Sequence, residues 1–359
     1  MTLRDLIAAR ISETGPITVA DYMADCLLHP EHGYYATRDP LGAAGDFTTA
    51  PEISQIFGEL LGLALAQAWL DQGRPAPFVL AEPGPGRGTL MADILRATRA
   101  VPGFAEAAQV TLIEASPTLR KIQAERLSNH TPRWLDRLDQ LPDLPLFLVA
   151  NEFFDALPIR QFLRDGGGWR EKRIALDGGR LVFGLTDPAP QPGLAHRLAD
   201  TGDGDMVEIC PAAAPMAGEI AARIAGHGGA ALIVDYGGWR SRGDTLQALC
   251  AHRFTDPLDA PGSADLTAHV DFEPLAAAAI ASACAASPLI SQGVFLERLG
   301  ITARAQALAE GLAGAALDDL VAAHRRLTHP DEMGNLFKVL GLYPNGAAPL
   351  PGLEPMPAP

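Results

Sequence analysis

Short apolar runs and amphipathic segments follow one another along the chain in a regular order. The apolar runs predict buried strands near residues 78–82, 110–114, 146–150, 230–237 and 335–340. Amphipathic segments near 88–99 and 117–127 predict helices between the first three strands. Strands that alternate with helices form a parallel sheet with right-handed crossovers. The pattern therefore predicts an α/β fold built on a doubly wound, Rossmann-like sheet.

Residues 159–228 follow a different pattern. Short strand-like runs are joined there by the glycine-rich stretches 165–168 and 177–179, which are turn signals for an antiparallel meander. A further strand is expected at 206–209 and a helix at 211–225. We expect this segment to be an inserted β-rich subdomain beside the core.

The two ends of the chain complete the expected domain organisation. Residues 1–74 combine helical patterns with a loop rich in small and aromatic residues, and a long helix is expected at 52–71. We interpret them as an N-terminal helical extension that completes the ligand site. The core then consists of residues 75–158 and 229–343. The last segment, 344–359, is rich in Pro, Gly and Ala and is expected to be disordered.

A glycine-rich turn joins the first predicted strand of the core to the first predicted helix. Gly84, Gly86 and Gly88 allow the backbone to turn sharply and to approach a ligand without a Cβ atom in the way. The helix that follows points its free amide groups at the turn, which favours anionic or polar ligand groups. Strand, turn and helix together predict a site for a nucleotide-like cofactor.

Two acidic residues indicate which cofactor this is. The dinucleotide fingerprint needs a glycine at the sixth position from Gly84, where this chain has Thr89. Glu82 precedes the glycines, where it would repel a pyrophosphate but suits a cationic amino acid group. Glu114 ends the second strand, where a carboxylate typically binds ribose hydroxyls. This arrangement is the pattern of class I S-adenosylmethionine methyltransferases. A nicotinamide site and a ligand-free glycine turn are the alternatives.

Polar residues also follow the other predicted strands. Asn151, Glu152 and Asp155 come directly after the strand at 146–150, and Asp235 lies within the run 230–237. The carboxyl ends of parallel strands form the ligand crevice, so these side chains are expected beside the cofactor. Helix capping and a solvated surface are the alternative interpretation for residues 151–155. His269 is a candidate proton acceptor, or equally a capping or packing histidine.

Two neighbouring hydroxyl residues precede the long helix of the N-terminal segment. Thr48 and Thr49 follow Phe47, and together they are candidates for lining the cofactor pocket. The alternative is that they only cap the helix and pack against it.

Composition limits the classes of partner and compartment. The chain has 359 residues, of which 48% are hydrophobic and 20% charged, so it can bury a substantial core. A formal net charge of −15 argues against nucleic acid as a partner. The cysteines, Cys26, Cys210, Cys250 and Cys284, form no C-x-x-C pair, which favours reduced thiols and no zinc site. With no apolar run of membrane-spanning length, we expect a soluble, cytoplasmic protein without a metal.

Five motifs occur along the chain in a fixed order. They are GDFTTAPEISQIFGE at 45–59, EPGPGRGTL at 82–90, ANEFFDALP at 150–158, VDYG at 234–237 and DLTAHVDF at 265–272. Together they resemble the MidA family, which includes the mitochondrial complex I assembly arginine methyltransferase and its bacterial relatives. The resemblance extends from Gly15 to about Tyr343. It implies a bacterial member with a class I methyltransferase fold, an added N-terminal segment and an inserted subdomain.

The resemblance also implies an activity, namely transfer of a methyl group from S-adenosylmethionine to an arginine of a protein, with a complex I subunit as the model target. Such an enzyme mainly orients its nucleophile against the methyl group. The glycine turn would hold the methionine end of the cofactor, with Glu82 near its ammonium group. Glu114 would bind the ribose, and Ala115 would contact the adenine.

A guanidinium substrate needs carboxylates to fix it and a route for the proton that it loses. We expect Glu152 and Asp155 to form this clamp, with Asp235 or His269 assisting. Protein arginine methyltransferases with twin glutamates use similar logic, but this chain has no second glutamate at a matching spacing. Two other functions stay open, a methyltransferase for small molecules and a non-catalytic assembly factor. The sequence does not indicate an oligomeric state.

Overall fold

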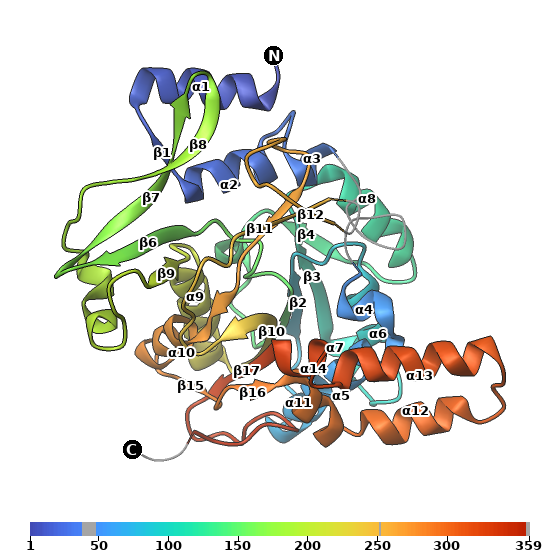
Figure 1. Cartoon of the computed structure of the whole chain (residues 1–359). Helices are drawn as coiled ribbons and strands as arrows, with labels where there is room; N and C mark the ends of the chain where they lie inside the picture. Colours follow the sequence, from blue (N-terminus) through green and yellow to red (C-terminus); the bar gives the residue numbers. More distant parts are fainter. Residues whose placement is uncertain (38–47, 251–252, 357–359) are drawn as a thin grey trace.

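A computed structural model describes residues 1–37, 48–250 and 253–356 (Figure 1). Its centre is a mixed sheet. In spatial order its main strands are β15 (Cys284–Ala286), β17 (Phe337–Pro344), β10 (Gly229–Gly238), β5 (Leu146–Asn151), β2 (Phe78–Pro83), β3 (Ala108–Ile113) and β4 (Arg133–Leu135). The strands from β10 to β4 are parallel, whereas β17 is antiparallel to both of its neighbours. Short strands β14 (Val270–Asp271) and β16 (Ile290–Ser291) pair with β10 and β17.

The central sheet is buried on both faces, which explains why its strands are nearly continuous apolar runs. In β10, Leu232 and Val234 belong to the hydrophobic core on one face, while Ala231 and Ile233 belong to the core on the other. This alternation is the twofold side-chain period of a strand. Helices α5 (Gln55–Asp71) and α6 (Thr89–Thr98) cover the first face, and α9 (Ala213–His227) and α10 (Phe272–Ala281) cover the second.

Shorter helices complete the core. They are α7 (Phe104–Ala107), α8 (Pro117–Arg126), η1 (Leu138–Gln140), α11 (Gln292–Arg298) and α14 (Met333–Leu336). Helices α12 (Ile301–Ala309) and α13 (Ala315–Thr328) form a hairpin that projects from the body (Figure 1). The buried carboxylate of Glu59 on α5 accepts hydrogen bonds from Arg96 of α6 and Arg304 of α12, each at 2.8 Å. This ion pair network ties the hairpin to the core.

A second, antiparallel sheet contains the inserted segment. Its strands are β6 (Arg160–Asp165), β7 (Gly168–Asp177), β8 (Arg180–Leu185) and β9 (Met206–Ile209). The 3-10 helix η2 (Pro192–Ala199) connects β8 to β9. A strand from the chain's beginning, β1 (Ile17–Thr18), pairs with β7. Helices α1 (Leu3–Thr14) and α2 (Val19–Leu28) flank β1, so the N-terminal segment and the insert share one structural unit.

A small third sheet lies next to the N-terminal helices. It consists of β12 (Arg253–Thr255), β11 (Gln247–Cys250) and β13 (Asp265–Thr267), in that spatial order. Ala248 and Leu266 from this sheet pack in the same hydrophobic cluster as Tyr22 of α2. The short helix α3 (Tyr34–Thr37) follows α2 and contributes Tyr34 to this cluster. Three segments that are distant in the sequence therefore meet here.

The predicted fold class, an α/β Rossmann-like sheet with helices on both faces, is confirmed, but three details differ. The helix expected at 52–71 is interrupted. It divides into α4 (Ala50–Ile53) and α5 because Ser54 is extended (φ −155°, ψ 131°) and its hydroxyl accepts the N–H of Ile56. The helix expected at 211–225 in the insert is α9. It packs on the central sheet through Ala217, Ile220 and Ile224, whose helical spacing places them on one face.

The third difference concerns the segment after residue 343, which was expected to be disordered. Strand β17 continues to Pro344, and the chain beyond it folds back onto the core. Leu350 and Leu353 are buried there, with 1% and 8% of their surface exposed. The Pro, Gly and Ala composition concealed these two leucines, whose burial outweighs the local tendency to disorder. Among the described residues, no helix is long and apolar enough to cross a membrane.

Candidate active site

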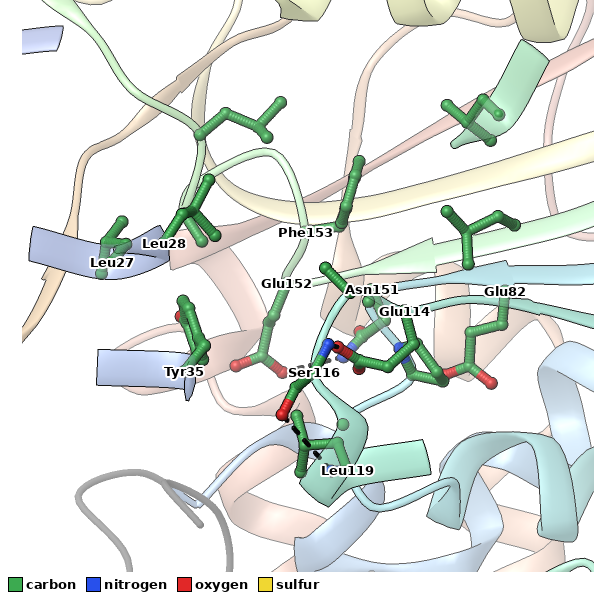
Figure 2. A pocket seen from close by; sticks show the side chains of 18 of the residues that line it. Leu27, Leu28, Tyr35, Glu82, Glu114, Ser116, Leu119, Asn151, Glu152 and Phe153 are labelled. Atoms are coloured by element: carbon green, nitrogen blue, oxygen red, sulfur yellow. Dashed lines mark hydrogen bonds between the residues drawn. The ribbon is translucent and has the colours of Figure 1, made fainter. Parts of the chain in front are cut away.

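The main cavity lies where the strand order of the central sheet reverses. From β2 the chain continues to β3 and β4 on one side, and later to β5 and β10 on the other. Ligands of open α/β sheets bind at such a switch point, outside the carboxyl ends of the strands. The cavity there has a volume of about 860 Å³, and Figure 2 shows part of its lining. Eight of the predicted site residues line it: Thr49, Glu82, Gly84, Gly86, Glu114, Ala115, Asn151 and Glu152.

The glycine turn after β2 adopts a backbone that favours glycine at all three positions. The φ angles of Gly84, Gly86 and Gly88 are +61°, +52° and +77°. A Cβ atom on Gly84 would lie 2.8 Å from Cδ2 of Phe153, so this position also lacks space for a side chain. Gly84 and Gly86 line the cavity, whereas Gly88 serves as the N-cap of α6. The turn thus brings bare backbone to the cavity wall.

Glu82 lies at the carboxyl end of β2 with only 4% of its surface exposed. Its Oε2 atom has no hydrogen-bond partner in the part of the chain that the structure describes. Burial raises the pKa of this carboxyl well above its usual range. A buried carboxylate with an unpartnered oxygen is costly, so this residue favours a cationic group in the cavity.

Glu114, at the end of β3, is held by its own loop and by α8. One carboxylate oxygen accepts the N–H of Ser116 at 2.7 Å, and the other accepts Nε2 of Gln123 at 3.2 Å. Gln123 also donates to the carbonyl oxygen of Gly86 at 2.7 Å and accepts Nε1 of Trp134 at 2.8 Å. Gln123 therefore fixes the glycine turn and the ribose-binding candidate relative to each other. Sequence reasoning missed it because its role depends on the packing of α8.

Asn151 and Glu152 end β5. Glu152 has φ +51°, which is rare for a residue with a side chain and indicates a strained backbone position. Its Oε1 accepts the N–H of Ala50 at 3.0 Å and Nδ2 of Asn151 at 2.9 Å, and burial raises the pKa of its carboxyl. Oδ1 of Asn151 is buried without a partner among the described residues. Such strain is characteristic of functional sites, where the surrounding contacts maintain it.

The other predicted catalytic residues lie behind the cavity wall. Asp235 is fully buried, and its two carboxylate oxygens accept the backbone N–H groups of Phe153, Phe154, Asp155 and Tyr236 at 2.9–3.3 Å. Burial and the nearby Glu152 raise the pKa of Asp235 to about 8, and the N–H groups that it accepts oppose this rise. These contacts make Asp235 a positioning residue for the loop after β5.

Asp155 and His269 also lie outside the cavity lining. Asp155 is 6% exposed, and its Oδ1 atom has no partner among the residues described. Burial, followed by the charges of Asp235, Glu152 and Asp265, raises its pKa well above the usual range. The His269 ring contacts the Tyr236 ring edge-on at 5.2 Å, and burial and Lys338 lower its pKa. The structure thus brings Glu152, Asp155 and Asp235 together, whereas His269 packs against Tyr236 outside the cavity lining.

The N-terminal segment contributes to the same cavity. Thr49 lines it and is the N-cap residue of α4, without a side-chain capping hydrogen bond. Thr48 is partly buried but is not part of the lining. Gly45, Asp46 and Phe47 of the first motif lie outside the described residues. In the next turn of the chain, Glu52 accepts a hydrogen bond from the Thr89 hydroxyl.

Sequence reasoning also missed several lining residues. They come from the N-terminal helices, from loops, from η1 and from α9: Leu27, Leu28, Tyr35, Asp136, Arg137, Leu138, Phe153, Leu157 and Met216. Phe153 and Leu157 belong to the motif at 150–158, whereas the others lie outside the five motifs and reach the cavity through tertiary packing. Within the described ranges, no group of three or more His, Cys, Asp or Glu side chains could hold a metal ion.

Comparison with known proteins identifies the class to which this fold and site belong. Residues 60–289 match the family model described as "Putative S-adenosyl-L-methionine-dependent methyltransferase". A solved structure from Burkholderia thailandensis, bound to S-adenosyl-homocysteine, superposes with a TM-score of 0.84 at 29% identity, covering 98% of this chain and 94% of that one. A second, native structure from the same organism gives a TM-score of 0.79 at 31% identity, with 96% and 92% covered. The protein is an S-adenosylmethionine-dependent methyltransferase.

Relatives that match over most of their length identify the methyltransferase family more specifically. The chain is 39% identical over 360 residues to "Protein arginine methyltransferase NDUFAF7, mitochondrial" of Danio rerio, with 92% of this chain and 84% of the relative covered. The Homo sapiens protein of the same name is 38% identical, with 94% and 82% covered. The chain therefore belongs to this methyltransferase family, and the resemblance to the MidA family is confirmed.

The residues of the cavity fit S-adenosylmethionine. The unpartnered Oε2 of Glu82 can accept from an ammonium group, and the buried Oδ1 of Asn151 offers a second free acceptor. Gly84 and Gly86 present bare backbone at the cavity wall, where a ligand can approach the turn closely. A cavity of about 860 Å³ is in the size range of small-molecule sites.

Proposed function

We propose that this protein transfers a methyl group from S-adenosylmethionine to an arginine side chain of a protein. The observation that carries the proposal is the strained, half-buried Glu152, which lines the cofactor cavity and whose charge helps to raise the pKa of the buried Asp155. Carboxylates of this kind suit a planar cationic guanidinium. The relatives from Danio rerio and Homo sapiens are named protein arginine methyltransferases, which supports the same substrate class.

For the cofactor, we propose that Glu82 binds the ammonium group and that Gly84, Gly86 and Gly88 allow the methionine end to approach the backbone. Glu114 would accept the ribose hydroxyls, with Ala115 against the adenine. Thr48, Thr49 and Asn151 would complete the polar wall. Support comes from the cavity lining, which includes all of these residues except Thr48 and Gly88. Gly88 acts through the turn itself, as the N-cap of α6.

For catalysis, we propose that Glu152 and Asp155 hold the guanidinium. When bound, S-adenosylmethionine would supply an electrophilic methyl group to a guanidine nitrogen, with S-adenosylhomocysteine as the leaving group. Glu152 orients that nitrogen and takes the proton that it loses, a role that the raised pKa of its carboxyl favours. Asp235 acts by holding the loop of residues 153–155 through their backbone N–H groups. The contacts of His269 support no catalytic role, so we assign it none.

We propose a respiratory complex I subunit as the model for the protein target, following the family resemblance. We also propose a cytoplasmic location, supported by cysteines that are all free thiols. The relatives are named mitochondrial, so the two compartments can differ within the family. Fractionation of the native host, followed by detection of the protein, tests the location.

Labelling experiments test the proposed reaction. The purified protein is incubated with methyl-labelled S-adenosylmethionine and an extract of its native host that lacks the gene. We expect label on an arginine of one or a few proteins, located by mass spectrometry. The matched control is Glu152→Gln, which keeps the shape and the acceptor for Ala50 but removes the charge. We expect it to bind the cofactor normally and to lose labelling. Label confined to lysine or to small molecules would contradict the proposal.

A further inference from the structure

Tyr35 forms a wall of the cavity at a distance from the glycine turn. It belongs to α3 of the N-terminal segment and lines the cavity together with Glu152 of β5. In Figure 2, Tyr35 lies at the opposite end of the labelled lining residues from Glu82, and the carboxylate of Glu152 extends between Tyr35 and Asn151. The cofactor candidates occupy the Glu82 end. Tyr35 therefore lies on the side that remains for the substrate.

The orientation of the Tyr35 ring is fixed from the far side. Its hydroxyl donates to Oδ1 of Asp265 at 2.9 Å, and Asp265 belongs to β13 of the small third sheet. Asp265 is buried, with 6% of its surface exposed. Burial, together with the charges of Asp265 and Asp155, raises the pKa of Tyr35 well above its usual range. The phenol thus stays neutral and remains a hydrogen-bond donor at physiological pH.

A second aromatic residue of the cavity, Phe153, has a different position. Its Cδ2 atom would lie 2.8 Å from a Cβ atom on Gly84, so this ring packs against the glycine turn. It therefore covers the cofactor side of the cavity. Among the lining residues of the described chain, Tyr35 is the aromatic side chain that shares the wall with Glu152 away from that turn.

We propose that Tyr35 determines the specificity for arginine, with its ring stacked on the guanidinium that Glu152 orients. The inference rests on the proposed function and adds the residue that selects the substrate. A planar, weakly hydrated guanidinium stacks on an aromatic face, whereas a lysine ammonium is a compact, strongly hydrated charge. Asp265 is the positioning residue that holds the ring.

The arginine-containing protein labelled by the enzyme is used to test this inference. Initial rates are measured for the wild type, Tyr35→Phe and Tyr35→Leu, with N-acetyl-L-arginine amide and N-acetyl-L-lysine amide as competitors. We expect Tyr35→Leu to raise KM for the protein about three- to thirtyfold, the range expected for a lost cation–π contact. The arginine amide should also lose its advantage over the lysine amide as a competitor. Tyr35→Phe keeps the ring and should keep most of this preference.

Two controls separate a role in specificity from a loss of structure. Phe254→Leu removes an aromatic ring that is 75% exposed on β12 and does not line the cavity, so its KM should equal that of the wild type. Calorimetry with S-adenosylhomocysteine should give the same affinity for every variant. An unchanged KM and unchanged competitor preference in Tyr35→Leu would overturn the inference. Equal loss of cofactor affinity would also overturn it, because Tyr35 would then serve the cofactor side.

Failure of the proposed function gives a different result from failure of this inference. If the unmodified enzyme labels no arginine, the proposed function fails and the role of Tyr35 falls with it. If arginine is labelled and Tyr35→Leu behaves like the wild type, only the role of Tyr35 fails.

Discussion

The Oδ2 atom of Asp235 accepts the backbone N–H of Phe154 at 2.9 Å. The same carboxylate accepts three further backbone N–H groups, so one buried side chain organises the loop that follows β5. Because Glu152 begins this loop with a positive φ, the loop needs such a support to keep its strained backbone. The acid predicted to assist in catalysis thus holds the backbone of this loop.

Replacing Asp235 should destabilise the protein. Asp235→Ala leaves four buried N–H groups without an acceptor, and we expect a loss of about 2–4 kcal/mol in the free energy of unfolding. Urea denaturation measures it as a lower midpoint at an unchanged slope. Asp319→Ala, on the exposed part of α13, is the control and should change little. A loss at Asp235 no larger than at Asp319 would show that the loop does not depend on this carboxylate.

Gly86→Val should abolish measurable cofactor binding. Gly86 has φ +52° and lines the cavity, so valine adds both backbone strain and bulk where the ligand lies. Gly178→Val is the matched control, because Gly178 has φ +54° in a turn where a Cβ atom meets nothing within 4 Å. We expect both variants to lose stability and only Gly86→Val to lose binding of S-adenosylhomocysteine in calorimetry. Normal affinity in folded Gly86→Val would exclude the turn from the cofactor site.

Cofactor binding should release protons from Glu82. Burial raises the pKa of this carboxyl in the free protein, so it is partly protonated there, and a bound ammonium group favours its ionised form. Affinity should therefore rise as the pH increases above the usual range of a glutamate carboxyl, while the ligand's amino group stays charged, by up to about tenfold per unit. Calorimetry in buffers of different ionisation enthalpy measures the protons released. Glu82→Gln should abolish the release, whereas Glu13→Gln, on exposed α1 surface, should retain it.

The same linkage predicts how the free protein responds to pH. A carboxyl whose pKa is higher in the folded state than in the unfolded state contributes stability at low pH and loses it as pH rises towards the folded pKa. For Asp235 this window runs from the ordinary aspartate pKa of 3.8 to about 8. Saturation with S-adenosylhomocysteine should reduce the part of this loss that comes from Glu82.

Gln123→Leu should weaken cofactor binding, although residue 123 does not contact the ligand directly. Leucine fills a similar volume but cannot hold the Gly86 carbonyl oxygen and the Glu114 carboxylate together. We expect affinity for S-adenosylhomocysteine to fall by about tenfold, the effect of one lost hydrogen bond to a charged group. Gln67→Leu, which changes an exposed glutamine of α5, serves as control. If the two variants bind equally well, Gln123 does not position the site.

The strands of the central sheet were predictable because both of their faces are buried. The expected runs at 78–82 and 146–150 correspond to β2 (Phe78–Pro83) and β5 (Leu146–Asn151). The closing strand was placed at 335–340 but extends over Phe337–Pro344. Its start was misplaced because the short helix α14 occupies residues 333–336, and four residues carry too little periodicity to be recognised.

Some residues of the candidate site were predictable from the sequence in the same way, and others were not. Glu82, Glu114 and Glu152 were predictable because each follows a recognisable buried strand, and strand ends gather at one edge of a parallel sheet. Gln123 and Tyr35 were not, since their positions depend on how α8 and α3 pack against distant parts of the chain. Asp235 was expected at the edge of the crevice, but β10 continues to Gly238 and the Asp235 side chain lies outside the cavity lining. Its hydrogen bonds to the loop could not be read from the sequence.

The pairing of Ile17 with Ile174 constrains the order in which the protein can assemble during synthesis. Strand β1 cannot pair with β7 until β7 has left the ribosome. The hydroxyl of Tyr35 can donate to Asp265 only later, because Asp265 is synthesised after β7. The glycine turn, by contrast, lies among β2, β3 and β5, which are synthesised close together in time. The half of the pocket around the glycine turn can therefore form on the nascent chain well before the wall that contains Tyr35.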